Sequence, residues 1–147
     1  MHPTSIEYLL QSAKTIAVVG LSPKPARASY EVAAYMQKNG YRIIPINPGQ
    51  AGASILGETC YANLAEAVLA TGLRIDIVNC FRKSEDIPPI VEDAIAVGAS
   101  CLWMQLDIRN DAAAKRAEEA GMQVITDKCL KIEYARQFSE QHHNHKY

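Results

Sequence analysis

The sequence predicts an α/β fold: a doubly wound, Rossmann-like parallel sheet of five strands, with helices on both faces. Two observations predict it. Short β-branched or apolar runs alternate with stretches of helical period, and continuous apolar runs such as IAVV and IIPI suit strands that are covered on both sides. This alternation requires right-handed crossovers, and we expect the strand order 3-2-1-4-5. The expected strands are residues 15–19, 41–46, 75–80, 100–104 and 123–126.

Polar caps and glycines delimit the helices between these strands. Asn63 and Ser84 are good N-caps, Asn110 or Asp111 starts a later helix, and Pro88-Pro89 suits a first helical turn. The connection over residues 48–59 is long, irregular and rich in small residues, which suits a loop near a ligand. The expected helices are residues 30–38, 63–69, 84–97, 110–120 and about 130–137.

Length and composition favour an ordinary globular domain. The chain has 147 residues, 48% of them hydrophobic and 21% charged, which predicts a single α/β domain over residues 1–147 rather than two cores. The polar tail from about residue 139 should fray. The net charge of −1 disfavours a duplex nucleic-acid partner. No run approaches the roughly 20 apolar residues that span a membrane, and no secretion signal begins the sequence, so we expect a cytoplasmic location.

A glycine turn follows the first strand, and it predicts an anion site. Gly20 lets the backbone approach a phosphate, and the next helix points free N–H groups at it. The dinucleotide fingerprint GxGxxG is missing, because only the first of its glycines is present. The second strand ends in Asn47-Pro48, where an NAD site has an acidic residue. NAD is therefore disfavoured.

Polar and cationic residues replace the missing glycines. Ser22 offers a hydroxyl, Lys24 and Arg27 offer positive charge, and Ser29 is expected to cap the helix. Cations beside a helix N-terminus suit a highly anionic ligand, since arginine grips phosphate through paired N–H donors. Solvated loop charges are the alternative interpretation.

A second basic pair, Arg82-Lys83, follows the third strand, and Phe81 before it is able to stack on a base or to join the core. Both clusters follow parallel strands, so they belong to one edge of the sheet, where ligands bind in such folds. We expect the crevice over the ends of the first and fourth strands.

These segments resemble the small stand-alone CoA-binding-domain proteins, which are similar to the N-terminal CoA-binding domain of the succinyl-CoA synthetase α subunit. The resemblance covers roughly residues 15–136. It rests on the blocks VVGLSPKPARASYEVAAYMQKNGYRIIPINP, DIVNCFRKSEDIP, CLWMQL and TDKCLKIEY.

The resemblance implies that coenzyme A is held at the switch point of the sheet. The phosphates would then lie against Gly20, Ser22 and Arg27. Asn47 and Pro48 would border the pocket, and Phe81 and Arg82 would border its nucleotide end. CoA carries a pyrophosphate and a 3′-phosphate, which agrees with two basic clusters.

Catalytic groups are scarce. All four histidines stand at positions 2, 142, 143 and 145, and no nucleophile is paired with a base. Cys129 is either a thiol activated at a helix start or a buried, inert one. We therefore expect a CoA or acyl-CoA binding module without chemistry of its own. The alternatives are an enzyme or enzyme subunit that uses bound CoA, in the manner of an acyl-CoA ligase, and an adenine-nucleotide-responsive interaction protein.

The remaining side chains carry weaker expectations. Asp76, Asp107 and Asp127 lie near strand ends, where solvated or capping carboxylates are common. Trp103, Met104 and Leu106 are candidates for contact with a protein partner or a second copy, provided that they are exposed. No metal site is expected, because the four cysteines are scattered and form no CxxC pair.

Overall fold

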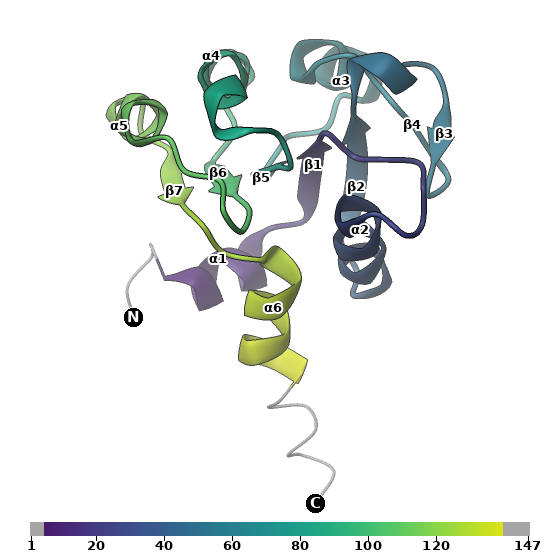
Figure 1. The fold of residues 1–147 in the computed structure, drawn as a ribbon, viewed down its shortest axis with the longest axis horizontal. Coiled ribbons are helices and arrows are strands. Elements are labelled where there is room, and N and C mark those ends of the chain that lie inside the picture. The colour runs from purple at the N-terminus through teal and green to yellow at the C-terminus, as the bar shows by residue number, and fades with distance from the viewer. Residues whose placement is uncertain (1–4, 140–147) are drawn as a thin grey trace, which may run out of the picture.

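The computed structural model describes residues 5–139 and confirms the α/β, doubly wound fold class (Figure 1). Five parallel strands form the main sheet, and each begins and ends within two residues of its expected range. The strands are β1 (Thr15–Val19), β2 (Arg42–Ile46), β5 (Ile77–Cys80), β6 (Cys101–Met104) and β7 (Gln123–Ile125). Expectations for the tail, including His142, His143 and His145, lie outside the described residues.

The expected strand order was wrong. The sheet runs β2-β1-β5-β6-β7, which is 2-1-3-4-5 when its five strands are numbered along the chain. Pro45 explains why β2 lies at the edge. Its carbonyl faces outward and accepts from the N–H of Tyr61 at 3.0 Å, so its missing N–H would also face outward. A further ladder strand there would lack a donor, which is why prolines in sheets belong to edges.

Two layers of helices cover the sheet, as Figure 1 shows. On one face α3 (Leu64–Thr71), α4 (Ile87–Ala96) and α5 (Asp111–Glu119) enclose an apolar core that includes Val19 and Val78. On the other face α1 (Ile6–Ser12), α2 (Ala28–Lys38) and α6 (Leu130–Tyr134) enclose a second core around Ile16, Ile77 and Trp103. Every residue of β1, β5 and β6 is buried, as a sheet covered on both sides requires.

The helix caps were predicted in part. The side-chain oxygens of Asn63 and Asn110 accept from backbone N–H groups of α3 and α5, as expected. Ser84 does not cap α4: it begins a short 3-10 turn, Ser84–Asp86, and its Oγ accepts from the N–H of Arg109 at 3.0 Å. The α-helix starts later because the two prolines are tolerated only in its first turn. Helix α1, capped by Ser5, was not predicted, and after α6 the chain continues as a π-helix, Ala135–Ser139.

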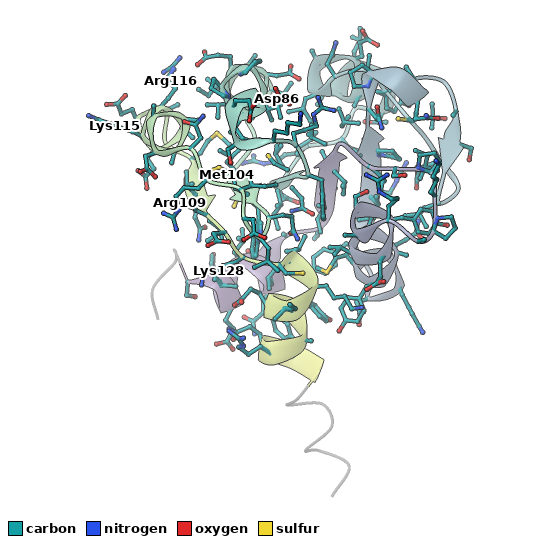
Figure 2. The ribbon with its side chains drawn as sticks, in the orientation of Figure 1. Asp86, Met104, Arg109, Lys115, Arg116 and Lys128 are labelled. Carbon is teal, nitrogen blue, oxygen red and sulfur yellow. The ribbon has the colours of Figure 1, made fainter. Side chains whose placement is uncertain are left out.

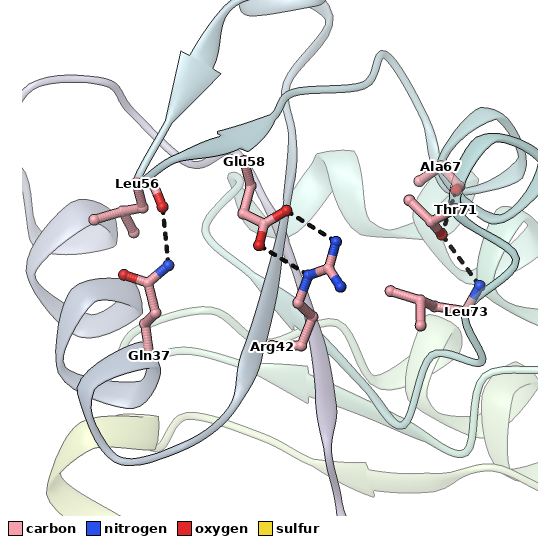
Figure 3. A network of polar contacts seen from close by, with 7 residues as sticks. All are labelled: Gln37, Arg42, Leu56, Glu58, Ala67, Thr71 and Leu73. Atoms are coloured by element: carbon pink, nitrogen blue, oxygen red, sulfur yellow. Dashed lines mark hydrogen bonds and ion pairs between the residues drawn. The ribbon is translucent and has the colours of Figure 1, made fainter.

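The connection after β2 is more ordered than expected. After a 3-10 turn at Pro48–Gln50 it forms a small antiparallel hairpin, β3 (Ser54–Ile55) and β4 (Glu58–Thr59). Figure 3 shows how this hairpin is held: Arg42 of β2 pairs with Glu58 at 2.8 Å, and the amide of Gln37 in α2 donates to the carbonyl of Leu56 at 2.9 Å. The hairpin therefore covers the edge of the sheet.

Two further observations concern surfaces. Trp103 and Met104 are fully buried, so the exposure on which their role as contact residues depended is not met, whereas Leu106 is half exposed. Between residues 5 and 139, no helix has the length and apolar character needed to cross a membrane.

Candidate functional site at the switch point of the sheet

The sheet's switch point lies between β1 and β5, because the chain leaves β1 toward β2 on one side and later returns to β5 on the other. The expected position of the crevice, over the first and fourth strands, was therefore wrong. The switch point lies between β1 and β5, the first and third sheet strands along the chain. This order makes β1 and β5 direct neighbours, with Val19 opposite Cys80. The glycine turn and the Phe81–Arg82 segment therefore emerge side by side.

Gly20 is the closest point between these two segments. Its φ is +91°, in the left-handed region, and a Cβ placed on it would lie 2.6 Å from the carbonyl oxygen of Phe81. Its N–H donates to the carbonyl of Ile46 at 2.7 Å. Only glycine satisfies both the dihedral angle and the close approach.

Hydrogen bonds hold the loop after Gly20 in place. The Oγ of Ser29 accepts from the N–H of Ser22 at 3.0 Å, and the Oγ of Ser22 accepts from the N–H of Lys24 at 3.1 Å. The amide of Asn47 donates to the carbonyl of Leu21 at 3.0 Å, which joins this loop to the end of β2. Ser22, Ser29 and Asn47 thus shape the loop.

Ser29 was expected to cap the helix after the glycine turn, but it does not occupy the N-cap position of α2. Helix α2 begins one residue before Ser29, and the N-cap position is Arg27, whose side chain makes no capping hydrogen bond. The first N–H groups of this eleven-residue helix are therefore not satisfied by a side chain of the N-cap, which leaves them available to an anion.

Unpaired positive charge surrounds this helix start. No ion pair within residues 5–139 uses Lys24, Arg27 or Lys83, and all three side chains are exposed. Arg82 differs, because it contacts Asp86 at 3.3 Å. The loop after β1 thus presents two cations, Lys24 and Arg27, without an ion-pair partner among the described residues, beside N–H groups of a helix start.

Two pockets meet at Arg82, which lines both. The first, which we call the α3–α4 pocket, has a volume of about 580 Å³ and lies on the α3 and α4 side of the sheet. Apolar groups such as Ile90 and Pro89 line it, together with Gly20 and the carboxylates of Glu85, Asp86 and Asp93. Figure 2 shows Asp86 at the turn into α4.

The second pocket, called the α2–α6 pocket, has a volume of about 440 Å³ and lies on the opposite face. Both volumes are within the range of small-molecule sites. Phe81 lines this second pocket and packs partly against the core beneath it, so it does not border the α3–α4 pocket. The remaining lining residues include Val32, Gln105, Leu106, Cys129 and Ile132.

The expected site residues are therefore only partly brought together. Gly20, Pro48 and Arg82 line the α3–α4 pocket, and Phe81 and Arg82 line the α2–α6 pocket. The others line neither pocket: Ser22, Lys24, Arg27, Ser29, Asn47 and Lys83.

Sequence reasoning missed the pocket walls contributed by Asn63, Asp93 and Gln105. Asn63 stood out only as a helix cap, although it opens the helix that crosses from β2 to β5. Asp93 is held by the fold, since its Oδ2 accepts from the N–H of Leu64 at 2.8 Å. No local pattern marks such contacts between elements.

The cysteines and carboxylates with catalytic potential are mostly structural. Burial raises the pKa of the Cys80 thiol to about 12 and also raises the pKa values of the Cys60 and Cys101 thiols, which makes them poor nucleophiles at neutral pH. Cys129 is buried as well, at 9% exposure, but lines the α2–α6 pocket.

Two aspartates hold backbone segments. Asp76 accepts from the N–H groups of Lys14 and Thr15, and Asp127 accepts from the N–H of Asp107 at 2.7 Å. No cluster of three or more candidate metal ligands occurs in the part of the chain that the structure describes.

A glycine turn at the switch point of a doubly wound sheet, beside a helix start with unpaired cations, is the arrangement in which such folds hold anionic nucleotide-like ligands. The sequence matches the CoA binding domain family over residues 14–135, and the chain belongs to that family. Membership supports a CoA-binding role.

Known proteins of similar sequence and structure match nearly the whole chain. The chain is 41% identical to the uncharacterized protein YneT of Bacillus subtilis (strain 168) over 130 residues, which cover 88% of this chain and 92% of YneT. A Thermus thermophilus structure superposes with a TM-score of 0.85 at 33% identity, covering 94% of this chain and all of that one. A hypothetical protein from Pyrococcus horikoshii OT3 superposes with a TM-score of 0.82 at 34% identity. The match covers 93% of this chain and 92% of that protein.

Proposed function

We propose that this protein binds coenzyme A or an acyl-CoA at the switch point between β1 and β5, as a binding module without chemistry of its own. The observation that carries the proposal is the pair of unpaired cations, Lys24 and Arg27, beside the uncapped start of α2 and directly after Gly20. CoA is the ligand of the family to which the chain belongs.

The residues present fit the phosphates of CoA. The pyrophosphate and the 3′-phosphate need several donors, and the loop after β1 supplies backbone N–H groups together with the charges of Lys24 and Arg27. Ser22 and Asn47 would act by shaping this loop, since their side chains already bond within it. Arg82 would contact the ligand where the two pockets meet.

The α3–α4 pocket suits the adenine end. Its apolar walls fit the flat face of a base, and its lining groups include the carboxylate acceptors of Glu85, Asp86 and Asp93. Adenine has an exocyclic amine that donates two hydrogen bonds, so its edge complements such acceptors. The phosphates would remain outside, nearer the cations, because carboxylates repel them.

We propose binding without catalysis because the chain offers few side chains able to act as a nucleophile or a base. An enzyme that joins an acid to CoA needs a nucleophile or a base near the acyl group. No histidine occurs between residues 3 and 141 to serve in that role. Three of the four thiols have pKa values raised by burial. These groups support binding better than catalysis.

Native mass spectrometry of the purified protein tests the binding proposal. The protein should carry an added mass equal to CoA or an acyl-CoA, either as purified or after incubation with CoA. A spectrum that shows only the bare chain after incubation with millimolar CoA would contradict the proposal.

A further inference from the structure

The α2–α6 pocket is lined by the side-chain amide of Gln105, whose nitrogen has no hydrogen-bond partner among the described residues. Gln105 is buried, with 5% of its surface exposed, and lines this pocket. Its Oε1 accepts two hydrogen bonds, from the side-chain amide of Asn79 at 2.9 Å and from the N–H of Leu130 at 2.9 Å.

These two donors determine which way the Gln105 amide lies. Because Oε1 is the only atom of that amide able to accept, it must face β5 and the start of α6. The Nε2 group then remains, and among residues 5–139 it has no hydrogen-bond partner. Nε2 is not among the side-chain atoms that the fold closes off completely, so it keeps a small accessible surface through which an acceptor can reach it. The pocket is where such an acceptor would lie.

The rest of the α2–α6 pocket is apolar and electrically compensated. Val32, Phe81, Leu106, Ile108 and Ile132 supply apolar side chains. The charged residues at its rim are already paired: Lys131 contacts Glu31 at 3.2 Å, and Arg82 contacts Asp86. Away from Ala28, where the start of α2 is assigned to the phosphates, the pocket therefore suits a neutral apolar group with a single acceptor.

We infer that the α2–α6 pocket holds the acyl group of a bound acyl-CoA, with Nε2 of Gln105 donating to the thioester carbonyl. This rests on the proposed function, since Arg82 joins the pocket to the site assigned to the nucleotide. An acyl thioester has a carbonyl acceptor, no donor and an apolar chain, which matches the pocket group by group. The substrate class is thus a CoA ester of an uncharged aliphatic acid.

Two of the apolar walls are exposed enough to be changed safely. Leu106 is 51% exposed and Ile132 is 46% exposed, so neither belongs to the core. Leu69 on α3 is 88% exposed and lines neither pocket, which makes it a matched control.

The test compares the affinities of CoA, acetyl-CoA and hexanoyl-CoA by isothermal titration. Each fully buried methylene contributes about 0.8 kcal/mol, or about fourfold in Kd, so hexanoyl-CoA should bind at least about tenfold more tightly than acetyl-CoA. Leu106→Ser and Ile132→Ser should reduce this gain to about threefold or less and leave the Kd of CoA unchanged. Leu69→Ser should change neither the gain in affinity with chain length nor the Kd of CoA.

Equal affinity for CoA and hexanoyl-CoA would overturn the inference, as would a chain-length gain that survives both pocket substitutions. Failure of every CoA compound to bind would instead refute the proposed function itself.

The role of Gln105 is tested by changing the ligand, so that the protein stays intact. S-hexyl-CoA lacks the carbonyl and should bind about two- to tenfold more weakly than hexanoyl-CoA. Equal binding of the two would contradict the role assigned to Nε2.

Discussion

The α-carbon of Gly20 faces the carbonyl oxygen of Phe81 so closely that a methyl group on it would lie 2.6 Å from that oxygen. This contact joins the turn after β1 to the end of β5, the two segments that frame the switch point. The backbone of this turn therefore depends on the absence of a side chain.

Gly20→Ala should lower both stability and CoA affinity. The left-handed φ costs of order 1–3 kcal/mol for a side-chain-bearing residue, and the contact with Phe81 adds to this cost. Gly40→Ala is the matched control, because Gly40 has a φ of +100° and no atom within 4 Å of its added Cβ. Thermal unfolding and titration should show the larger fall in Tm for Gly20→Ala and a binding defect for that variant alone. Equal effects of the two substitutions would contradict this explanation.

Arg27→Ala should weaken CoA binding by about 1.5–3 kcal/mol, the range for a hydrogen bond to a charged group. Thermal stability should barely change, since the exposed Arg27 side chain has no described ion pair. Arg74→Ala serves as control, because Arg74 lies before β5, away from the pockets. If Arg27→Ala binds CoA as well as the unchanged protein, Arg27 is a surface charge only.

Tyr41→Phe should destabilise the fold by about 1 kcal/mol at neutral pH, because the hydroxyl of Tyr41 donates to the carbonyl of Leu10. Burial, helped by the nearby Tyr134, raises the pKa of Tyr41 above its usual value of 10.0. The unfolded chain then loses this proton first, so the stabilisation is complete below pH 10 and declines as the pH rises above it.

Urea unfolding at pH 8 and pH 10.5 measures this effect. The advantage of the unchanged protein over Tyr41→Phe should shrink at the higher pH. Tyr8 is a more exposed tyrosine whose hydroxyl has no described partner. Tyr8→Phe should therefore leave the free energy of unfolding unchanged at pH 8 and at pH 10.5. An advantage that grows with pH would show that the sign is wrong.

Incubation of the pure protein with ATP, CoA and a panel of short carboxylic acids should yield no acyl-CoA above a protein-free control. The reason is the lack of a paired nucleophile and base around the two pockets. Liquid chromatography with mass detection measures the product. Acyl-CoA that follows the protein through purification and disappears in Cys129→Ser would make the protein an enzyme.

The strands and two of the helix caps could be predicted because their signals are local. Apolar runs identified all five sheet strands, and Asn63 and Asn110 lie where a helix needs a side-chain acceptor. The strand order could not be read from this periodicity, which says nothing about neighbours. Pro45 carried a usable signal, since a proline inside a strand favours the edge of a sheet.

The site was predicted in outline but not in its division into two faces. Phe81 directly follows Cys80, which packs in the α3–α4 core, and successive residues of an extended chain alternate sides. Phe81 therefore faces the α2–α6 pocket, and this alternation is the sequence signal that places it there. The contact of Gln105 with Asn79 and Leu130 depends on side-chain positions in three elements, and no sequence pattern predicts it.

We propose that the turn after β1 selects CoA over other nucleotides. Isothermal titration of the same protein preparation with CoA, NAD and ATP tests it most directly. CoA should bind more tightly than NAD, because NAD lacks the 3′-phosphate and the site lacks the glycines and the acidic residue of an NAD site. It should also bind more tightly than ATP, because CoA divides its phosphates between a pyrophosphate and a 3′-phosphate, which suits two separate basic clusters. Tighter binding of NAD than of CoA would contradict the account.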